Sequence, residues 1–202
     1  HRLGLYSVKS EMEDIWLRYK EPEAFNAITA KINRNVSDKD NKIDEFIAPI
    51  SESLKKAGFS FEIKKRVKTP YSIWNKMINK GITFDQIYDL YAVRIIFDPE
   101  EKSAETERDQ CYHIFSIITG LYRYKADRVR DWVNYPKNNG YEALHCTLMS
   151  TSGIWIEVQI RSRRMNEIAE KGIAAHWAYK KDGFADESES EMDKWITKVK
   201  DI

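Results

Sequence analysis

The chain has 202 residues, which can bury one substantial hydrophobic core, so a single domain is the default expectation. Its content of 42% apolar and 32% charged residues belongs to a soluble globular protein. The formal net charge is only +1, so no overall field draws the chain to nucleic acid or to a membrane. Any anion-binding site must therefore come from a local cluster among its 33 lysines and arginines.

The cysteines and the apolar segments indicate a cytoplasmic protein. Only Cys111 and Cys146 are present, and Cys146 falls on the apolar face of a predicted strand, which favours buried free thiols over a disulfide. No apolar run approaches the length of a membrane span, and there is no signal-peptide pattern. The chain begins at His1 within a predicted helix, so we expect it to be a piece of a longer protein.

Three helices are predicted before the first strand. Apolar residues at helical spacing predict a helix over residues 5–20, and Pro22 ends it because helix is disfavoured before a proline. A second helix is predicted over 23–33 and a third over 38–57, with Pro49 as a kink. The sequence then changes from the helical to the strand period.

A basic cluster lies where the first strand gives way to the next helix. The strand is predicted over residues 59–67, and Thr69 followed by a proline is a start signal for a helix over 71–79. In the first turn of such a helix, free backbone N–H groups and the positive dipole end favour phosphate. The residues that converge here, enough to hold a triphosphate, are Arg66, Lys68, Ser72 and Lys76. A solvated basic face is the alternative that the pattern alone leaves open.

Asp89 precedes a strand predicted over residues 91–97, and a helix is predicted over 109–121. A lone aspartate before a strand is more often a turn or cap residue than a ligand. Together with Glu157, however, Asp89 supplies the one or two carboxylates that Mg²⁺ usually takes beside substrate phosphates. The pair is sufficient if the two strands are neighbours.

The last two strands place polar side chains on a common face. In the strand predicted over residues 153–160, alternation directs Glu157 away from the core that its own strand helps to build. In the strand predicted over 141–149, Tyr141 and His145 share a face. These features indicate a nucleotide site, although an ordinary antiparallel hairpin with a polar outer face has the same pattern.

The loop over residues 136–140, PKNNG, is rich in turn residues and carries the cation Lys137, so it can bring backbone and charge close to a ligand. On the following strand, Gln159 and Arg161 share the face of Glu157 and either orient it or, for Arg161, form a surface cation at the strand end. A final helix is predicted over 163–179. Helices first, then strands interleaved with helices, predict an α/β (α+β) fold with a mixed sheet flanked by helices.

At these residues the chain resembles a known family. The segments RVRDWVNYPKNNGYEALH and EVQIRSRRMNEIAEKGIAAHWAYK resemble the synthetase domain of the RelA/SpoT homologues, the bacterial enzymes that make guanosine tetra- and pentaphosphate. RVKTPYSIWNKM resembles the ATP-binding segment of that family, and DLYAVRI resembles its D-x-x-A-x-R-I motif. The resemblance implies an approximately five-stranded mixed sheet of the polymerase β type of nucleotidyltransferase.

The resemblance also implies an activity, a (p)ppGpp synthetase that transfers pyrophosphate from ATP to the 3′-hydroxyl of GDP or GTP with Mg²⁺, leaving AMP. The implied catalytic and metal-binding residues are Asp89 and Glu157. The implied ATP-binding residues are Arg66, Lys68, Ser72, Lys76 and Arg94, the last stacking on adenine through its planar guanidinium. The implied residues for GDP or GTP are Arg130, Lys137, Asn139, Tyr141 and His145.

Three segments are expected. Residues 1–33 resemble the junction after the hydrolase domain of long members, 34–180 the synthetase domain, and 181–202 an acidic linker with the start of a further helix. The hydrolase metal motif is absent, and the acidic residues near the start, Asp14 among them, are interpreted as a solvated helix face. We therefore expect no alarmone hydrolysis and no bound nucleic acid, and regulation of the parent protein by absent domains and by the ribosome and tRNA.

Some positions depart from the family pattern. Lys65 stands where glycine is usual, and Arg130 stands where lysine is common, a basic variant that favours bifunctional parentage. The stretch before Arg128 lacks the customary histidine and prolines, so the family pattern does not predict the local fold or the acceptor-side loop there. Glu142, Ala143 and Ser162 are small changes. His176 is interpreted as a structural helix residue and is not assigned to the site.

Three other functions compete with this interpretation. A nucleotidyltransferase acting on RNA or an antibiotic usually carries two acidic residues one apart on a strand, and no such pair is found on a strand here. A non-catalytic module that binds guanine nucleotides needs neither Asp89 nor Glu157. A nucleic-acid-binding domain is a poor fit to a nearly neutral chain.

Overall fold

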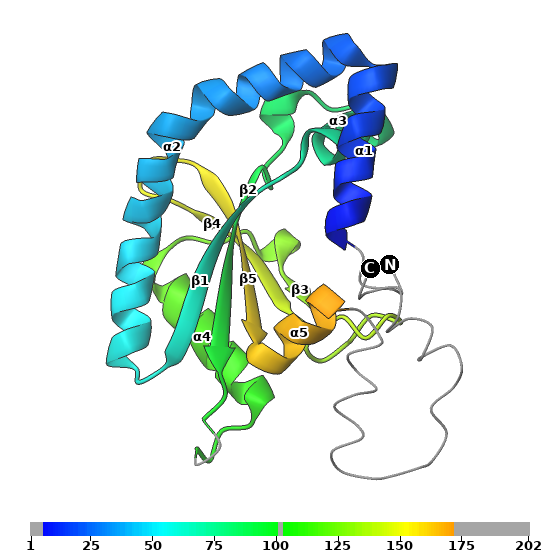
Figure 1. Ribbon diagram of the computed structural model, residues 1–202. Coiled ribbons are helices and arrows are strands. Elements are labelled where there is room, and N and C mark those ends of the chain that lie inside the picture. The colour runs from blue at the N-terminus through cyan, green and yellow to red at the C-terminus, as the bar shows by residue number, and fades with distance from the viewer. Residues whose placement is uncertain (1–5, 101–102, 172–202) are drawn as a thin grey trace, which may run out of the picture.

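The computed structural model describes residues 6–100 and 103–171 (Figure 1). In chain order its elements are α1 (Tyr6–Lys20), α2 (Pro22–Lys56), β1 (Ser60–Val67), α3 (Pro70–Lys80), β2 (Tyr91–Asp98), α4 (Glu107–Leu121), β3 (Arg130–Asp131), β4 (Leu144–Met149), β5 (Trp155–Ser162) and α5 (Arg163–Lys171). Short 3₁₀ turns cover Phe84–Gln86 and Ala126–Arg128. No helix among these described residues is long and apolar enough to cross a membrane.

The strands form one mixed five-stranded sheet in the order β1-β2-β5-β4-β3, which confirms the predicted fold class. β2 and β5 run parallel, and the other neighbouring pairs run antiparallel. β2 and β5 are thus adjacent at the centre of the sheet although more than fifty residues separate them in sequence. Asp89 immediately precedes one of these strands and Glu157 lies on the other, so the adjacency that a carboxylate pair requires is present.

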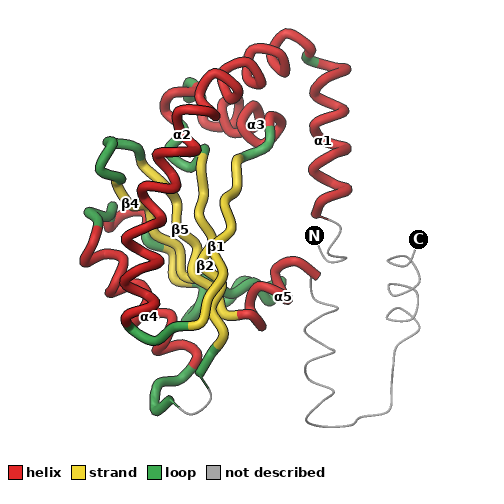
Figure 2. The backbone as a smooth tube through the Cα atoms, turned by 60° about the vertical axis from the view of Figure 1, so that its left-hand side comes forward, coloured by secondary structure: helices red, strands yellow, loops and turns green. Residues whose placement is uncertain are grey.

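One face of the sheet is covered by α2 and α4 and contains the hydrophobic core (Figure 2). Phe46, Ile50 and Leu54 of α2 are at most 1% exposed, as are Ile114 and Ile118 of α4. They pack with the inward side chains of the central strands, Val93, Ile95, Val158 and Ile160. Each such side chain contributes about 1.5–3 kcal/mol through burial, and this layer holds the central strands in fixed register.

The opposite face carries the polar residues, and α5 covers only one end of it (Figures 1 and 2). Because paired residues in neighbouring strands point to the same side, the register defines two rows across this face. One row is Lys64, Arg94, Gln159, His145 and Arg130. The row beside it is Arg66, Ala92, Glu157 and Thr147. The prediction that Glu157 points away from the core is confirmed.

The N-terminal helices differ from the prediction. A single helix, α2, spans residues 22–56, so the predicted division into helices over 23–33 and 38–57 is wrong. The stretch between them, RNVS, contains no glycine or proline, so nothing in its backbone chemistry ends a helix. Pro49 lies inside α2, as predicted, and α2 is visibly curved in Figure 1.

Several strand and helix ends also differ. β4 begins at Leu144 rather than 141, because Tyr141 belongs to the preceding turn, where its carbonyl accepts from the amide of Lys137 at 3.1 Å. The two-residue strand β3 was not predicted. Both cysteines are buried free thiols, as predicted. The predicted end of the last helix, His176 and residues 181–202 lie outside the described residues.

Candidate active site

The first half of the site is built on the N-terminus of α3. Thr69 caps the helix, since its Oγ1 accepts a hydrogen bond from the amide of Ser72 at 3.3 Å. Its hydroxyl also donates to Ser72 Oγ at 2.9 Å. Pro70 occupies the first turn, and Gly81 ends the helix in the left-handed conformation with a φ of 60°. The predicted helix start at Thr69 is confirmed.

A cavity of about 400 Å³ lies against this end of α3. Its walls include Lys68, Ser72 and Lys76, so the structure brings three of the five predicted ATP-binding residues together. The remaining wall residues are Lys9 and Glu13 of α1 with Tyr71, Asn75, Asn79 and Lys80 of α3. The contribution of α1 to this cavity was not foreseen from the sequence.

Asp89 is held between two lysines of this cavity. Lys76 Nζ donates to its Oδ1 at 2.5 Å and Lys68 Nζ to its Oδ2 at 3.2 Å. Burial alone would raise the pKa of Asp89, but the hydrogen bond from Lys76 and the charge of Lys68 outweigh burial and hold the pKa below its usual value. Asp89 is therefore ionised at neutral pH and holds both ammonium groups close to the first residue of β2.

Asp14 of α1 reaches the same helix end. Its Oδ1 accepts a hydrogen bond from the backbone amide of Tyr71 at 2.8 Å, and partial burial raises the pKa of this carboxyl. The rings of Tyr71 and Trp74 lie 6.0 and 5.7 Å from that of Trp16 on α1. The interpretation of Asp14 as part of a solvated face is wrong, because α1 packs on α3 and one of the free amides of α3 is occupied.

The second half of the site is a hydrogen-bonded network on the polar face of β4 and β5. Gln159 Nε2 donates to Glu157 Oε1 at 2.7 Å, and Arg161 Nη2 donates to Gln159 Oε1 at 2.9 Å. Arg161 also donates to the hydroxyl of Tyr141, which lies 2.7 Å from His145 Nε2. His145 Nδ1 lies 3.6 Å from Glu157 Oε1, which closes the ring of five residues.

His145 is neutral within this network. Burial, followed by the positive charges of Arg161 and Lys137, lowers the pKa of its imidazole to about 3. The hydroxyl of Tyr141 accepts from Arg161, and its own proton is available to Nε2 of His145 at 2.7 Å, which fits the tautomer with Nε2 as the acceptor. The ring proton is thereby assigned to Nδ1, which faces the carboxylate of Glu157.

Arg161 is a buried residue and not the surface cation that was one of two interpretations. It is 3% exposed because α5 begins directly after β5 and turns back over this end of the sheet. Burial lowers the pKa of its guanidinium, and its Nε has no hydrogen-bond partner among the described residues. Its guanidinium carbon lies 4.7 Å from the ring centroid of Tyr141. Arg161 therefore fixes Tyr141 and Gln159 at once.

The loop before β4 presents the other predicted guanine-nucleotide residues. Lys137 is exposed, and its Nζ lies 4.5 Å from the ring centroid of Trp132 and 5.1 Å from that of Tyr141. The loop turns tightly at Gly140, where φ is +73° and the amide donates to the carbonyl of Lys137 at 2.8 Å. Asn139 Oδ1 accepts from the amide of Tyr141 at 3.3 Å.

Three predicted residues lie on the polar face but outside both clusters. Arg94 donates to Glu170 of α5 at 2.6 Å and to Asn166 at 3.3 Å, so its guanidinium is held toward α5. Arg66 is exposed beside Ala92 in the row of Glu157. Arg130 pairs with His145 in the sheet and donates to the carbonyls of two neighbouring residues.

Asp89 and Glu157 are the two predicted metal ligands, and they lie on or next to neighbouring strands. Glu157 of β5 pairs with Ala92 of the parallel strand β2, and Ala92 is three residues after Asp89. No group of three or more acidic, histidine or cysteine residues arranged for a metal occurs within the described part of the chain. This donor set suits an ion that takes most of its oxygen ligands from a substrate and water, as Mg²⁺ does.

Comparisons with known proteins agree on one family. The model described as "Region found in RelA / SpoT proteins" matches residues 65–183. A GTP pyrophosphokinase of Escherichia coli K12 is 35% identical over 202 residues, which cover 98% of this chain and 26% of that protein. A guanosine-3′,5′-bis(diphosphate) 3′-pyrophosphohydrolase of Aquifex aeolicus is 36% identical over 181 residues, 89% of this chain and 25% of that protein. The chain thus spans about a quarter of the length of these relatives.

Solved structures share the fold. The small alarmone synthetase 1 of Bacillus subtilis, bound to its product pppGpp, superposes with a TM-score of 0.53 at 18% identity and covers 85% of this chain and 94% of its own. The small alarmone synthetase 2 of the same species gives 0.50 at 24% identity, with 79% and 87% covered. The fold, the sequence matches and the family model agree, and the chain belongs to the family defined by the region found in RelA and SpoT proteins.

Proposed function

We propose that this chain is the synthetase region of a (p)ppGpp synthetase. It transfers the terminal pyrophosphoryl group of ATP to the 3′-hydroxyl of GDP or GTP and releases AMP with ppGpp or pppGpp, the alarmones of the stringent response. The observation that carries the proposal is the position of Glu157. It belongs to the hydrogen-bonded network that contains Tyr141, and its strand is the neighbour of β2, the strand that follows Asp89. Relatives named GTP pyrophosphokinase, about four times longer than this chain, support the assignment.

The donor half of the site binds the phosphates of ATP. Lys68, Ser72 and Lys76 face one cavity, and both lysines are held there by Asp89. A triphosphate carries more negative charge than one carboxylate, so it draws the two ammonium groups from Asp89. Arg66, which is exposed, and Arg94, once released from Glu170, are the planar cations available for adenine.

The acceptor half binds GDP or GTP. The ring of Tyr141 stacks on guanine, and the donors for the phosphates and ribose are Lys137, Asn139 and Arg130. All of them lie on the polar face of the sheet, of which α5 covers only one end. Neutral His145 contributes hydrogen bonds rather than charge. The amide of Gln159 donates to the Glu157 carboxylate and orients it, while Nδ1 of His145 lies 3.6 Å from the same oxygen. Glu157 is then positioned to accept the proton of the attacking 3′-hydroxyl.

Mg²⁺ fits this donor set, with Asp89 and Glu157 as the protein ligands. The ion would neutralise charge on the pyrophosphoryl group as the hydroxyl attacks its phosphorus. The chain's own residues do the positioning, because phosphoryl-type transfer depends mostly on holding the two reactants in line. Asp89 becomes available as a ligand when Lys68 and Lys76 turn to the phosphates.

The remaining proposals concern the longer protein. We propose that residues 1–33 join this region to a preceding hydrolase domain, that 34–180 form the synthetase domain, and that 181–202 lead to further domains. Under this proposal the hydrolase activity belongs to the preceding domain, and the flanking domains, the ribosome and tRNA regulate the synthetase from outside this chain. The matched relatives are long enough to hold such domains.

Product analysis tests the proposed activity. The chain is incubated with Mg²⁺, ATP and either GDP or GTP, beside a Glu157→Gln variant that keeps the size of the side chain. We expect AMP and the tetra- or pentaphosphate from the wild-type chain, with a loss of roughly 10³-fold in the variant. Failure to bind either nucleotide would contradict the proposal, while binding of guanine nucleotide with no transfer under any condition would favour a regulatory module.

A further inference from the structure

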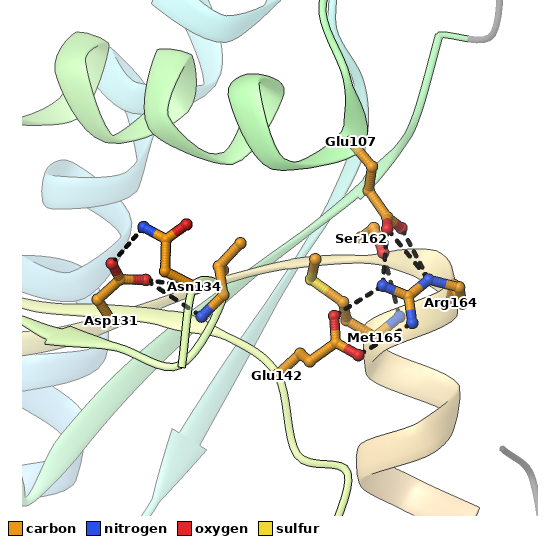
Figure 3. Close-up of polar contacts among 8 residues, drawn as sticks. Glu107, Asp131, Asn134, Glu142, Ser162, Arg164 and Met165 are labelled. Carbon is orange, nitrogen blue, oxygen red and sulfur yellow. Dashed lines mark hydrogen bonds and ion pairs between the residues drawn. The ribbon is translucent and has the colours of Figure 1, made fainter. Parts of the chain in front are cut away.

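Arg164 lies in the first turn of α5 and is gripped by two carboxylates from distant parts of the chain (Figure 3). Its Nε and Nη2 donate to Glu107 of α4, with a shortest distance of 2.7 Å. Its Nη1 and Nη2 donate to Glu142 at 3.1 and 2.8 Å. The guanidinium thus makes a two-pronged contact with each carboxylate, the strongest form of such a pair.

The two carboxylates belong to different layers of the molecule. Glu107 starts α4, which packs on the core face of the sheet. Glu142 directly follows Tyr141, in the segment that joins the 136–140 loop to β4. Arg164 itself sits two residues after β5, at a helix start where Ser162 Oγ accepts from the amide of Met165 at 3.1 Å. Arg164 therefore ties the segment that follows the 136–140 loop to the end of the strand that bears Glu157.

The electrostatics favour a lasting contact. The exposed fractions of the three side chains are 32% for Arg164, 27% for Glu107 and 16% for Glu142. The hydrogen bond with Glu142 is the largest influence on Arg164, and together with Glu107 it raises the pKa of the guanidinium above its usual value. One cation faces two anions, so removal of either carboxylate leaves the other bound. None of these residues has a part in the proposed transfer.

We propose that the Arg164–Glu142 pair is a positioning device for the guanine nucleotide. It acts through Tyr141, whose backbone is continuous with Glu142, and holds the stacking ring at a fixed distance from Glu157. Glu107 anchors Arg164 to α4 and does not act on the loop. This inference rests on the proposed function, since it assigns the loop to the guanine nucleotide.

Two alanine variants of matched chemistry test the device. Glu142→Ala and Glu107→Ala each remove one carboxylate and one charge from the same guanidinium, but only the first frees the loop. For Glu142→Ala we expect the KM for GDP to rise about tenfold with the KM for ATP unchanged. For Glu107→Ala we expect the KM for GDP to stay within about twofold of wild type, whatever the change in thermal stability. Glu142→Gln keeps an acceptor for Arg164 and should recover most of the affinity.

Hydrogen exchange provides a readout that does not depend on activity. In the nucleotide-free protein, the amides of Lys137, Gly140 and Tyr141 are hydrogen-bonded within the loop. Glu142→Ala should speed their exchange, and Glu107→Ala should leave it unchanged. Equal effects of the two alanine variants on exchange or on the KM for GDP would overturn the positioning role. If the wild-type chain makes no product, the proposed function fails, while the exchange result still decides whether Arg164 anchors the loop.

Discussion

The two halves of the site are built by opposite means. At α3, two lysines share one carboxylate beside an open cavity, and all three groups carry charge. On β4, β5 and the turn before β4, a neutral histidine, a tyrosine and a glutamine connect Glu157 to a buried arginine. Ion pairs at a cavity exchange partners when a stronger anion arrives, whereas a mostly buried hydrogen-bonded network resists rearrangement.

This difference separates the tasks of the two halves. Under the proposed function, the half at α3 binds the ATP phosphates: Asp89 holds Lys68 and Lys76 in place, and the phosphates would replace Asp89 as their partner. The acceptor half is a fixed frame that orients Glu157 and Tyr141 before a nucleotide binds. Substitutions in the donor half should therefore act on ATP, and substitutions in the acceptor half should also act on the stability of the fold.

Among the variants that distinguish the two halves, Lys76→Met should have the largest effect. This change removes a charged hydrogen bond from the phosphates and leaves Asp89 with one cation, and hydrogen bonds to charged groups contribute about 1.5–3 kcal/mol, or roughly 10–100-fold. We expect kcat/KM for ATP to fall by that factor, measured by AMP release at saturating GDP. Lys80→Met is the matched control, because Lys80 lines the same cavity but is exposed and is not held by Asp89. Equal losses in the two variants would show that the cavity binds ATP only through its general charge.

The acceptor half should affect the pH dependence of the free energy of unfolding, through His145. The pKa of His145 is about 3 in the folded protein against 6.5 ordinarily, so between these values the unfolded chain binds a proton that the folded chain does not. The free energy of unfolding therefore falls as the pH drops below about 6.5, by up to about 1.4 kcal/mol per pH unit. Above about pH 7 His145 makes no contribution to the pH dependence.

Denaturant unfolding at pH 7.5, 6 and 5 measures this slope. Between pH 6.5 and 5 we expect the wild-type chain to lose on the order of 2 kcal/mol through this histidine. His145→Asn should remove that part of the slope, while His113→Asn, at an exposed position on α4, should retain it. If the free energy of unfolding changes equally with pH in all three proteins, His145 is not held neutral in the folded protein.

The smallest effect concerns Arg94, which lies on the polar face between the two halves. Its guanidinium is held toward α5 by an ion pair with Glu170, whose side chain is more than half exposed. Such pairs contribute about 0.2–1 kcal/mol. Glu170→Gln should therefore lower the KM for ATP by about two- to fivefold and leave the KM for GDP unchanged, measured by initial rates. A higher KM for ATP in this variant would mean that Arg94 binds ATP while it is paired with Glu170, and that the pair need not break.

The parts that sequence predicts correctly are those with a local cause. The start of α3 follows from Thr69 and Pro70, two adjacent residues whose chemistry is sufficient. The orientation of Glu157 follows from alternation within one strand, and the mixed sheet follows from the order of the elements. For the helix start and for Glu157 the information lies within about ten residues of the feature, and the sheet type needs only the order of the elements along the chain.

The parts that sequence misses depend on distant contacts. Asp14 meets the amide of Tyr71 across 57 positions, and no local pattern signals that contact. The burial of Arg161 depends on where α5 turns, and the direction of Arg94 depends on Glu170, 76 positions away. Strand β3 has two residues and exists only through its pairing with β4. A basic cluster could be recognised from the sequence, but its carboxylate partners could not be assigned.

A crystal structure of the chain with Mg²⁺, GDP and an ATP analogue that carries a methylene bridge between the α- and β-phosphates tests the central claim most directly. We expect the triphosphate among Lys68, Ser72 and Lys76, guanine on Tyr141, and the 3′-hydroxyl within hydrogen-bond reach of Glu157. Asp89 should have released at least one of its lysines. Guanine bound away from Tyr141, or phosphates bound elsewhere while both lysines stay on Asp89, would contradict the account.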